Sequence, residues 1–184
     1  MSETCYLTLK VMKINPSRAQ EWAVALNNTL GTEFADGQEV IDLLKASNNC
    51  LDCDTDDFSP DGARTFARAL VNMDKDAVWW MVEQGEDGEP GTLCDYNYEL
   101  GLYTRDCDME GEPIVGTDAI VQIIDDPDAT LESVREGIRA LYGIAWRQWR
   151  EDWVENGDKR EREALAREEA EVLESIKAAF RNQS

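Results

Sequence analysis

Apolar residues recur with a helical period over residues 130–156, the longest such run in the chain. Placed at 100° per residue, they fall within an arc of about 140°, which is typical of an amphipathic helix that buries one face. The arc comprises Leu131, Val134, Ile138, Leu141, Tyr142, Ala145, Trp146, Trp149 and Trp153. Asp128 or Thr130 can cap the start of this helix, and Asn156-Gly157 marks its end. The pattern therefore predicts one helix over residues 130–156.

Four stretches are predicted to be β-strands, and two of them, residues 5–14 and 93–104, show the alternation of side chains that is typical of strands. Residues 5–14 place apolar side chains at every second position, and residues 77–83 are rich in Val and Trp. Residues 93–104 alternate aromatic or aliphatic with polar side chains, so we expect one wet face. The turn-rich stretch 85–91 predicts a hairpin that joins these last two strands. A further strand is predicted over residues 116–124.

Helical periods with start signals predict three helices in the first half of the chain and one at its end. The first covers residues 16–31 and begins with a cap residue followed by proline. The next two cover residues 38–46 and 59–73, and the last covers residues 158–180. Residues 48–57 are polar and lack a period, so we expect a loop there.

These elements predict an α+β fold with an antiparallel sheet of about three to four strands, packed by helices, and two C-terminal helices. We expect residues 1–156 to form an acidic α+β domain. The helix within residues 157–184 has a thin apolar stripe, so it is expected to pack on that domain or on a partner.

The charge of the chain is extreme and unevenly distributed. The formal net charge is −21 over 184 residues, and 42% of the residues are hydrophobic, which is enough for a core. Residues 1–129 hold 27 Asp and Glu against 8 Lys and Arg, whereas residues 130–184 hold 12 against 10. Repulsion among so many acidic side chains destabilises the folded state. Their presence therefore indicates a benefit that offsets this cost, such as solubility or binding to a basic partner.

Catalysis has little support in the sequence. The chain contains no histidine, which removes Ser-His and Cys-His pairs and the commonest general base. No glycine-rich phosphate loop is present. Acidic residues are so abundant that a pair of them does not indicate a hydrolytic site. We therefore expect a protein that is not an enzyme and has no cofactor.

The cysteines and the first aspartate run raise the question of a metal. Cys50 and Cys53 have the spacing of zinc ligands and redox motifs, but neighbouring aspartates disfavour a thiolate. A four-cysteine zinc site would need a second closely spaced pair, but twelve residues separate Cys94 from Cys107. The run from Asp52 begins like a calcium-binding loop but lacks its glycine and its closing glutamate. We expect reduced cysteines, no disulfide and no bound metal.

The spacing of the acids is more informative than their number. Asp106, Asp108, Glu110 and Glu112 occur at every second position, so in an extended backbone they would point to one side about 6.6 Å apart. A similar spacing recurs near residue 54, and a third cluster lies near residue 126. The candidate partner-binding residues are Asp52, Asp54, Asp56, Asp57, Asp106, Asp108, Glu110, Glu112, Asp125, Asp126 and Asp128.

Carboxylates at this spacing can imitate the phosphates of a nucleic-acid strand. In charge and size, the chain resembles the DNA-mimic proteins that phages and plasmids use against restriction and CRISPR systems. The resemblance implies a non-catalytic inhibitor that occupies the basic surface of a nucleic-acid-binding protein or complex, without binding nucleic acid itself. A solvated acidic face that serves only solubility is the simpler alternative.

A structural or assembly module is the second functional hypothesis. In that hypothesis the C-terminal helices bind a partner or form a homodimer. The first residues lack the basic and apolar pattern of a secretion signal, and no apolar run is long enough to span a membrane. We therefore expect a cytoplasmic location, which would be the host cytoplasm for a phage-encoded protein.

Overall fold

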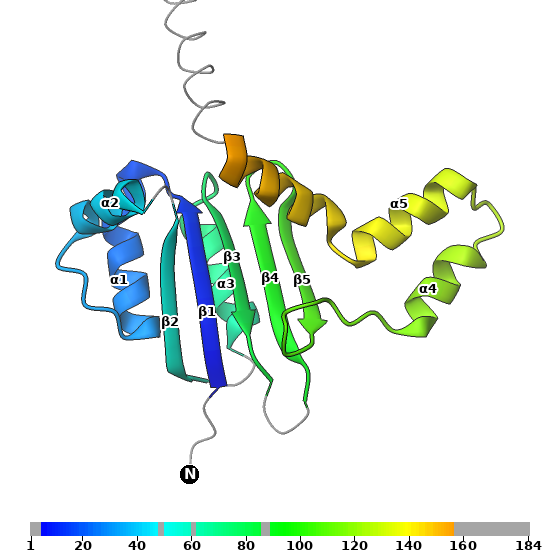
Figure 1. Ribbon diagram of the computed structural model, residues 1–184, viewed down its shortest axis with the longest axis horizontal. Coiled ribbons are helices and arrows are strands. Elements are labelled where there is room, and N and C mark those ends of the chain that lie inside the picture. Colours follow the sequence, from blue (N-terminus) through cyan, green and yellow to red (C-terminus); the bar gives the residue numbers. More distant parts are fainter. Residues whose placement is uncertain (1–4, 48–49, 60–61, 86–88, 157–184) are drawn as a thin grey trace, which may run out of the picture. The chain divides into compact units, whose positions relative to one another are not determined.

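The computed structural model describes residues 5–47, 50–59, 62–85 and 89–156, which form an α+β fold around one antiparallel sheet (Figure 1). The five strands are β1 (Cys5–Lys13), β2 (Leu51–Phe58), β3 (Val78–Glu83), β4 (Gly91–Asn97) and β5 (Gly101–Cys107). Their order across the sheet is β2-β1-β3-β4-β5, and all neighbours are antiparallel. The predicted α+β class and antiparallel sheet are confirmed, with five strands in place of three to four.

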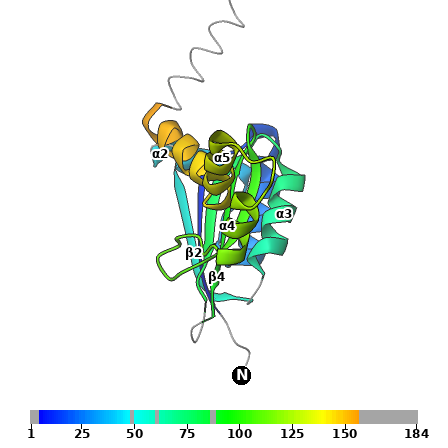
Figure 2. The same ribbon diagram turned by 90° about the vertical axis from the view of Figure 1, so that its right-hand side faces the viewer.

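A group of helices packs against one face of this sheet to form the main core. They are α1 (Ala19–Leu30), which follows the short 3-10 helix η1 (Pro16–Arg18), then α2 (Gly37–Ala46) and α3 (Ala63–Met73), which Figure 2 shows on that face from the side. Alternate β1 residues such as Leu7 and Leu9 are fully buried with Trp22 and Leu26 of α1 in the main core. On the opposite face of the sheet, which we call the open face, a smaller cluster of Val82, Leu93, Tyr103 and Cys107 is buried over β3–β5, whereas Asp52 and Asp54 of β2 are exposed.

Side-chain caps mark the starts of η1 and α2, whereas α3 begins at Ala63, four residues after the predicted start at residue 59, without a side-chain cap. The Asn15 side chain accepts a hydrogen bond from the Ser17 backbone N–H at 3.0 Å and caps η1. Asp36 caps α2 by accepting from the Glu39 N–H at 3.0 Å. Gly31 ends α1 with φ of 67°, a left-handed conformation that glycine adopts without the steric strain of a Cβ atom.

The expected loop over residues 48–57 is wrong, because residues 51–58 form strand β2. Aspartate has a low strand propensity, and the four aspartates among these eight residues remove the sequence pattern that would indicate a strand. Leu51, Cys53 and Phe58 are buried in the main core, and β1 supplies the hydrogen-bonding partner. Tertiary pairing thus overrides local propensity.

The single strand expected over residues 93–104 is also wrong, because the chain turns there and forms a β4–β5 hairpin. The Asn97 side chain accepts from the backbone N–H groups of Glu99 and Leu100, and Gly101 has φ of 79°. The expected wet face is not wet, since Asp95 and Asn97 are at most 4% exposed. The expected hairpin around residues 85–91 is confirmed by the β3–β4 pairing.

The expected strand over residues 116–124 is instead a helix, α4 (Thr117–Ile124), which pairs with α5 (Leu131–Leu141). Thr130 caps α5, and its hydroxyl oxygen accepts from the Ser133 N–H at 3.1 Å. The helix expected over residues 130–156 is interrupted at Gly143, whose φ is 60°, and residues 144–156 are helical again. Gly143 lies against the ring of Tyr103, where a Cβ atom would come within 2.7 Å.

The chain divides into two compact units, Met1–Trp146 and Arg147–Ser184. In the second unit, Trp149 and Trp153 stack with ring centroids 5.2 Å apart and planes 9° from parallel. The helix expected over residues 158–180 lies outside the described residues. None of the helices in the described part of the chain combines the length and apolarity that a membrane span requires.

Candidate interaction surface

The first acidic cluster lies on the edge strand β2, and its side chains reach the open face. Leu51 and Cys53 face the helices, so the alternation of the strand turns Asp52 and Asp54 to the other side. Both aspartates are exposed, as is Asp56 further along the strand. The backbone of Asp57 belongs to β2 as well. β2 therefore presents carboxylates along one edge of the open face.

One cation lies beside this row. Lys10 is opposite Asp52 in the β1–β2 register, and its Nζ lies 3.6 Å from an Asp52 oxygen. The two side chains are 44% and 55% exposed, so water screens the pair and it contributes little to stability. Thr8, not a cation, is opposite Asp54. The row thus keeps most of its negative charge.

The second cluster does not form the evenly spaced row that an extended backbone would give. Asp106 is on β5 and faces the helices, where it forms an ion pair with Arg64 of α3. After β5 the chain turns, and the Asp108 side chain accepts from the backbone N–H groups of Glu110 and Glu112. The three acids that follow β5 are exposed, but they share a turn and not a strand face.

That turn brings the second cluster onto the open face. Gly111 has φ of 80°, and a Cβ atom there would lie 3.2 Å from Cγ2 of Val82 on β3. Val82 faces away from the helices, so the turn of residues 108–112 crosses the open face over β3. β3 is two strands from β2, about 10 Å at the usual strand spacing. The aspartates of β2 and the turn of residues 108–112 therefore share one face, and Asp106 does not belong to it.

The third cluster lies elsewhere. Asp125, Asp126 and Asp128 are exposed between α4 and α5, and the Asp126 carboxylate accepts from the Asp128 N–H at 3.0 Å. Figure 1 shows the α4–α5 pair beyond β5, at the other end of the sheet from β2. The predicted acidic residues therefore do not form one continuous surface.

The four cysteines considered as zinc ligands point in different directions. Cys53 on β2 and Cys94 on β4 face the helices three strand positions apart, whereas Cys107 packs on the open face. Burial raises the pKa of Cys53 and Cys107 to about 12 and that of Cys94 to about 11, so these thiols stay protonated. Thiolates at these positions cannot reach one tetrahedral ion. Within the described ranges no group of His, Cys, Asp or Glu side chains is arranged to hold a metal.

Besides Asp95, the acids Glu83 and Asp74 are buried, and they lie at the two ends of α3. Glu83 is 4% exposed and accepts from the Ala63 backbone N–H at the start of α3 and from the Cys5 thiol. A carboxylate at that position also faces the positive end of the helix dipole. Asp74 follows the last turn of α3 and is 2% exposed. No local pattern distinguishes these two acids from the many others in the chain.

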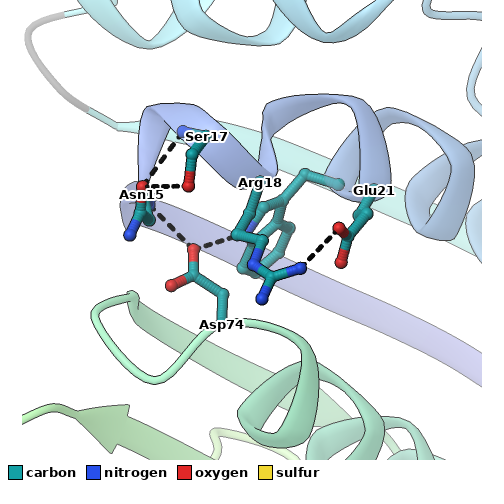
Figure 3. Close-up of polar contacts among 6 residues, drawn as sticks. Asn15, Ser17, Arg18, Glu21 and Asp74 are labelled. Carbon is teal, nitrogen blue, oxygen red and sulfur yellow. Dashed lines mark hydrogen bonds and ion pairs between the residues drawn. The ribbon is translucent and has the colours of Figure 1, made fainter.

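Figure 3 shows how Asp74 ties α3 to the start of η1 and α1. One carboxylate oxygen accepts from the Asn15 backbone N–H at 2.8 Å and from the Trp22 indole N–H at 2.9 Å. The other accepts from the Asp76 N–H at 3.1 Å. A buried carboxylate with three N–H partners has a structural role, so Asp74 belongs to the core and not to the interaction surface.

Comparisons of the chain with protein-family models, with curated proteins and with solved structures found no match. The functional argument therefore rests on the placement of the acidic side chains.

Proposed function

We propose that this protein is a non-catalytic, acidic interaction protein that occupies the basic nucleic-acid-binding surface of another protein in the cytoplasm, as a DNA mimic does. The observation that carries the proposal is the sharing of the open face by the aspartates of β2 and the turn of residues 108–112. Carboxylates two residues apart on a strand are separated by about 6.6 Å, comparable with the separation of phosphates along a nucleic-acid strand.

The charge of the chain supports the same class of partner. A net charge of −21 repels nucleic acid and accelerates encounters with a basic surface. A phage or plasmid inhibitor of a restriction or CRISPR complex is the narrower form of the proposal. It rests on resemblance in charge and size.

Three aspartate-to-asparagine changes on β2 test the surface. The variant Asp52→Asn/Asp54→Asn/Asp56→Asn removes three charges and retains side-chain size. Three equivalent changes between α4 and α5 make the matched control, because they alter net charge equally at a different place. These control positions are Asp125, Asp126 and Asp128.

The assay captures basic proteins from a bacterial lysate on the immobilised chain at low salt. Each captured protein is then tested for binding to labelled double-stranded DNA, with and without the chain. We expect the wild-type chain and the control to compete with DNA, and the β2 variant to compete at least tenfold less well. Competition should fall steeply with salt because fixed charges on both sides are screened. Equal competition by both variants would mean that only total charge matters, and no competition by the wild type would refute the proposal.

A second candidate is an assembly module, which the α4–α5 pair favours. Neither helix buries a residue fully, and Leu131 is 88% exposed with Ile124 at 54%. Exposed apolar side chains of this kind mark contact sites in other proteins. Size-exclusion chromatography with light scattering tests it: a dimer that Leu131→Ser and Ile124→Ser convert to a monomer would support this candidate, and a wild-type monomer would refute self-assembly.

A further inference from the structure

The outer side of β2 is a sheet edge. β2 is at the end of the strand order, and within the described ranges β1 is its sole strand neighbour. An edge strand presents backbone N–H and C=O groups that can pair with another extended chain. In Figure 1, β2 is the leftmost strand, at the opposite side of the sheet from β5.

The register decides which backbone groups face this edge. The Gln84 N–H donates to the Tyr6 carbonyl at 2.8 Å, so the backbone groups of Tyr6 point toward β3. Alternate residues of a strand direct these groups to opposite sides, so Leu7 and Leu9 direct theirs toward β2. Leu9 is opposite Cys53, whose backbone groups therefore point inward to β1.

It follows that Asp52 and Asp54, on either side of Cys53, direct their backbone N–H and C=O groups to the free edge. Their carboxylates lie on the open face. An added strand that hydrogen-bonds to these two residues would place its directly opposed side chains about 4.5–5.5 Å away, Cβ to Cβ. Backbone pairing and charge pairing thus coincide at the same two residues.

Charge complementarity selects the occupant of this edge. A second copy of β2 would oppose aspartate to aspartate, which destabilises a strand pair. Lysine or arginine at every second position of an added strand would instead face Asp52 and Asp54. The intervening residues would lie on the helix side beside Leu51 and Cys53, which are buried and apolar. Apolar side chains suit those positions.

We propose that the β2 edge binds, by strand addition, an extended basic segment of the partner in which Lys or Arg alternates with apolar residues. This inference rests on the proposed function for the charge of the partner and adds the way in which it is bound. Main-chain hydrogen bonds would supply affinity, and the alternating charges would set register and specificity.

Three synthetic peptides of the repeating pattern Lys-Val-Lys-Val-Lys test the inference on the full-length protein. The first is unmodified. The second is N-methylated at the lysines, whose N–H groups would donate to the carbonyl groups of Asp52 and Asp54. The third is N-methylated at the valines, whose N–H groups would face away from β2. All three carry the same charge, and their affinities are compared by isothermal titration calorimetry at low salt.

We expect lysine methylation to weaken binding at least tenfold and valine methylation to change it less than about twofold. Asp52→Asn/Asp54→Asn should weaken binding of the unmodified peptide about tenfold, whereas Asp125→Asn/Asp128→Asn should not. Peptide binding should also slow amide hydrogen exchange at Asp54 and leave Cys53, already paired to β1, unchanged.

Equal affinities for the two methylated peptides would overturn strand addition, because charge alone would then account for binding. The proposed function would survive that result, since competition with DNA is measured separately. Absence of binding by the unmodified peptide would also overturn the inference. The opposite result is also informative. If the protein does not compete with DNA but still binds the peptides, with lysine methylation weakening binding more than valine methylation, the proposed function is refuted and the strand-addition site remains.

Discussion

Removal of the Asp74 carboxylate should be among the most damaging single changes in the chain. Asp74→Ala leaves the Trp22 indole N–H without its acceptor in a fully buried position, and the Asn15 backbone N–H also loses its partner. A hydrogen bond to a charged group contributes about 1.5–3 kcal/mol. Water can replace the third bond, because Asp76 is exposed. Two lost bonds give an expected destabilisation of about 3–6 kcal/mol.

Urea unfolding monitored by circular dichroism measures this loss. Asp76→Ala is the matched control: it removes the same charge from an exposed side chain that accepts from the Asn15 amide, and we expect it to cost less than about 1 kcal/mol. A double-mutant cycle with Trp22→Phe isolates the indole bond, because the cavity left by the smaller ring cancels in the cycle. A loss for Asp74→Ala below about 1 kcal/mol, or equal to that of the control, would refute the argument.

Three further outcomes are expected. Gly143→Ala should destabilise clearly more than Gly31→Ala, because both positions have a positive φ but only Gly143 lies against an aromatic ring; equal melting points would contradict this. Stability should fall between pH 9 and about 12, because unfolding lets Cys53 and Cys107 ionise near the ordinary thiol pKa of 9.0, while burial holds the pKa of both at about 12 in the folded state. In Cys53→Ala, the free energy of unfolding should decrease less steeply with pH, as measured by urea unfolding at several pH values across this range. Trp153→Ala should cost about 3–5 kcal/mol in thermal unfolding, as for other buried aromatics, and an unchanged midpoint would show that its ring packs little.

The pattern of the sequence was sufficient for the presence of the helices of the first half, although α3 begins at Ala63 and not at the predicted residue 59. The backbone hydrogen bonds of a helix join residues four apart, so its apolar period and its capping residues all lie within one short stretch of sequence. Asn15 and Thr130 therefore act as predicted. The exposure of the aspartates near residues 54, 108 and 126 also followed from composition, since charged groups without partners stay in water.

The tertiary structure alone decided where those aspartates lie. β2 is a strand because β1, whose paired residues lie 40 or more positions earlier, supplies its partner and the helices bury its alternate side chains. Asn97 turns the chain into a hairpin through bonds that periodicity does not reveal. Asp74 resembles its exposed neighbours in sequence and differs only by the donors that other segments bring to it. Strand pairing and carboxylate burial depend on contacts between distant residues, and a local pattern cannot encode which of those contacts form.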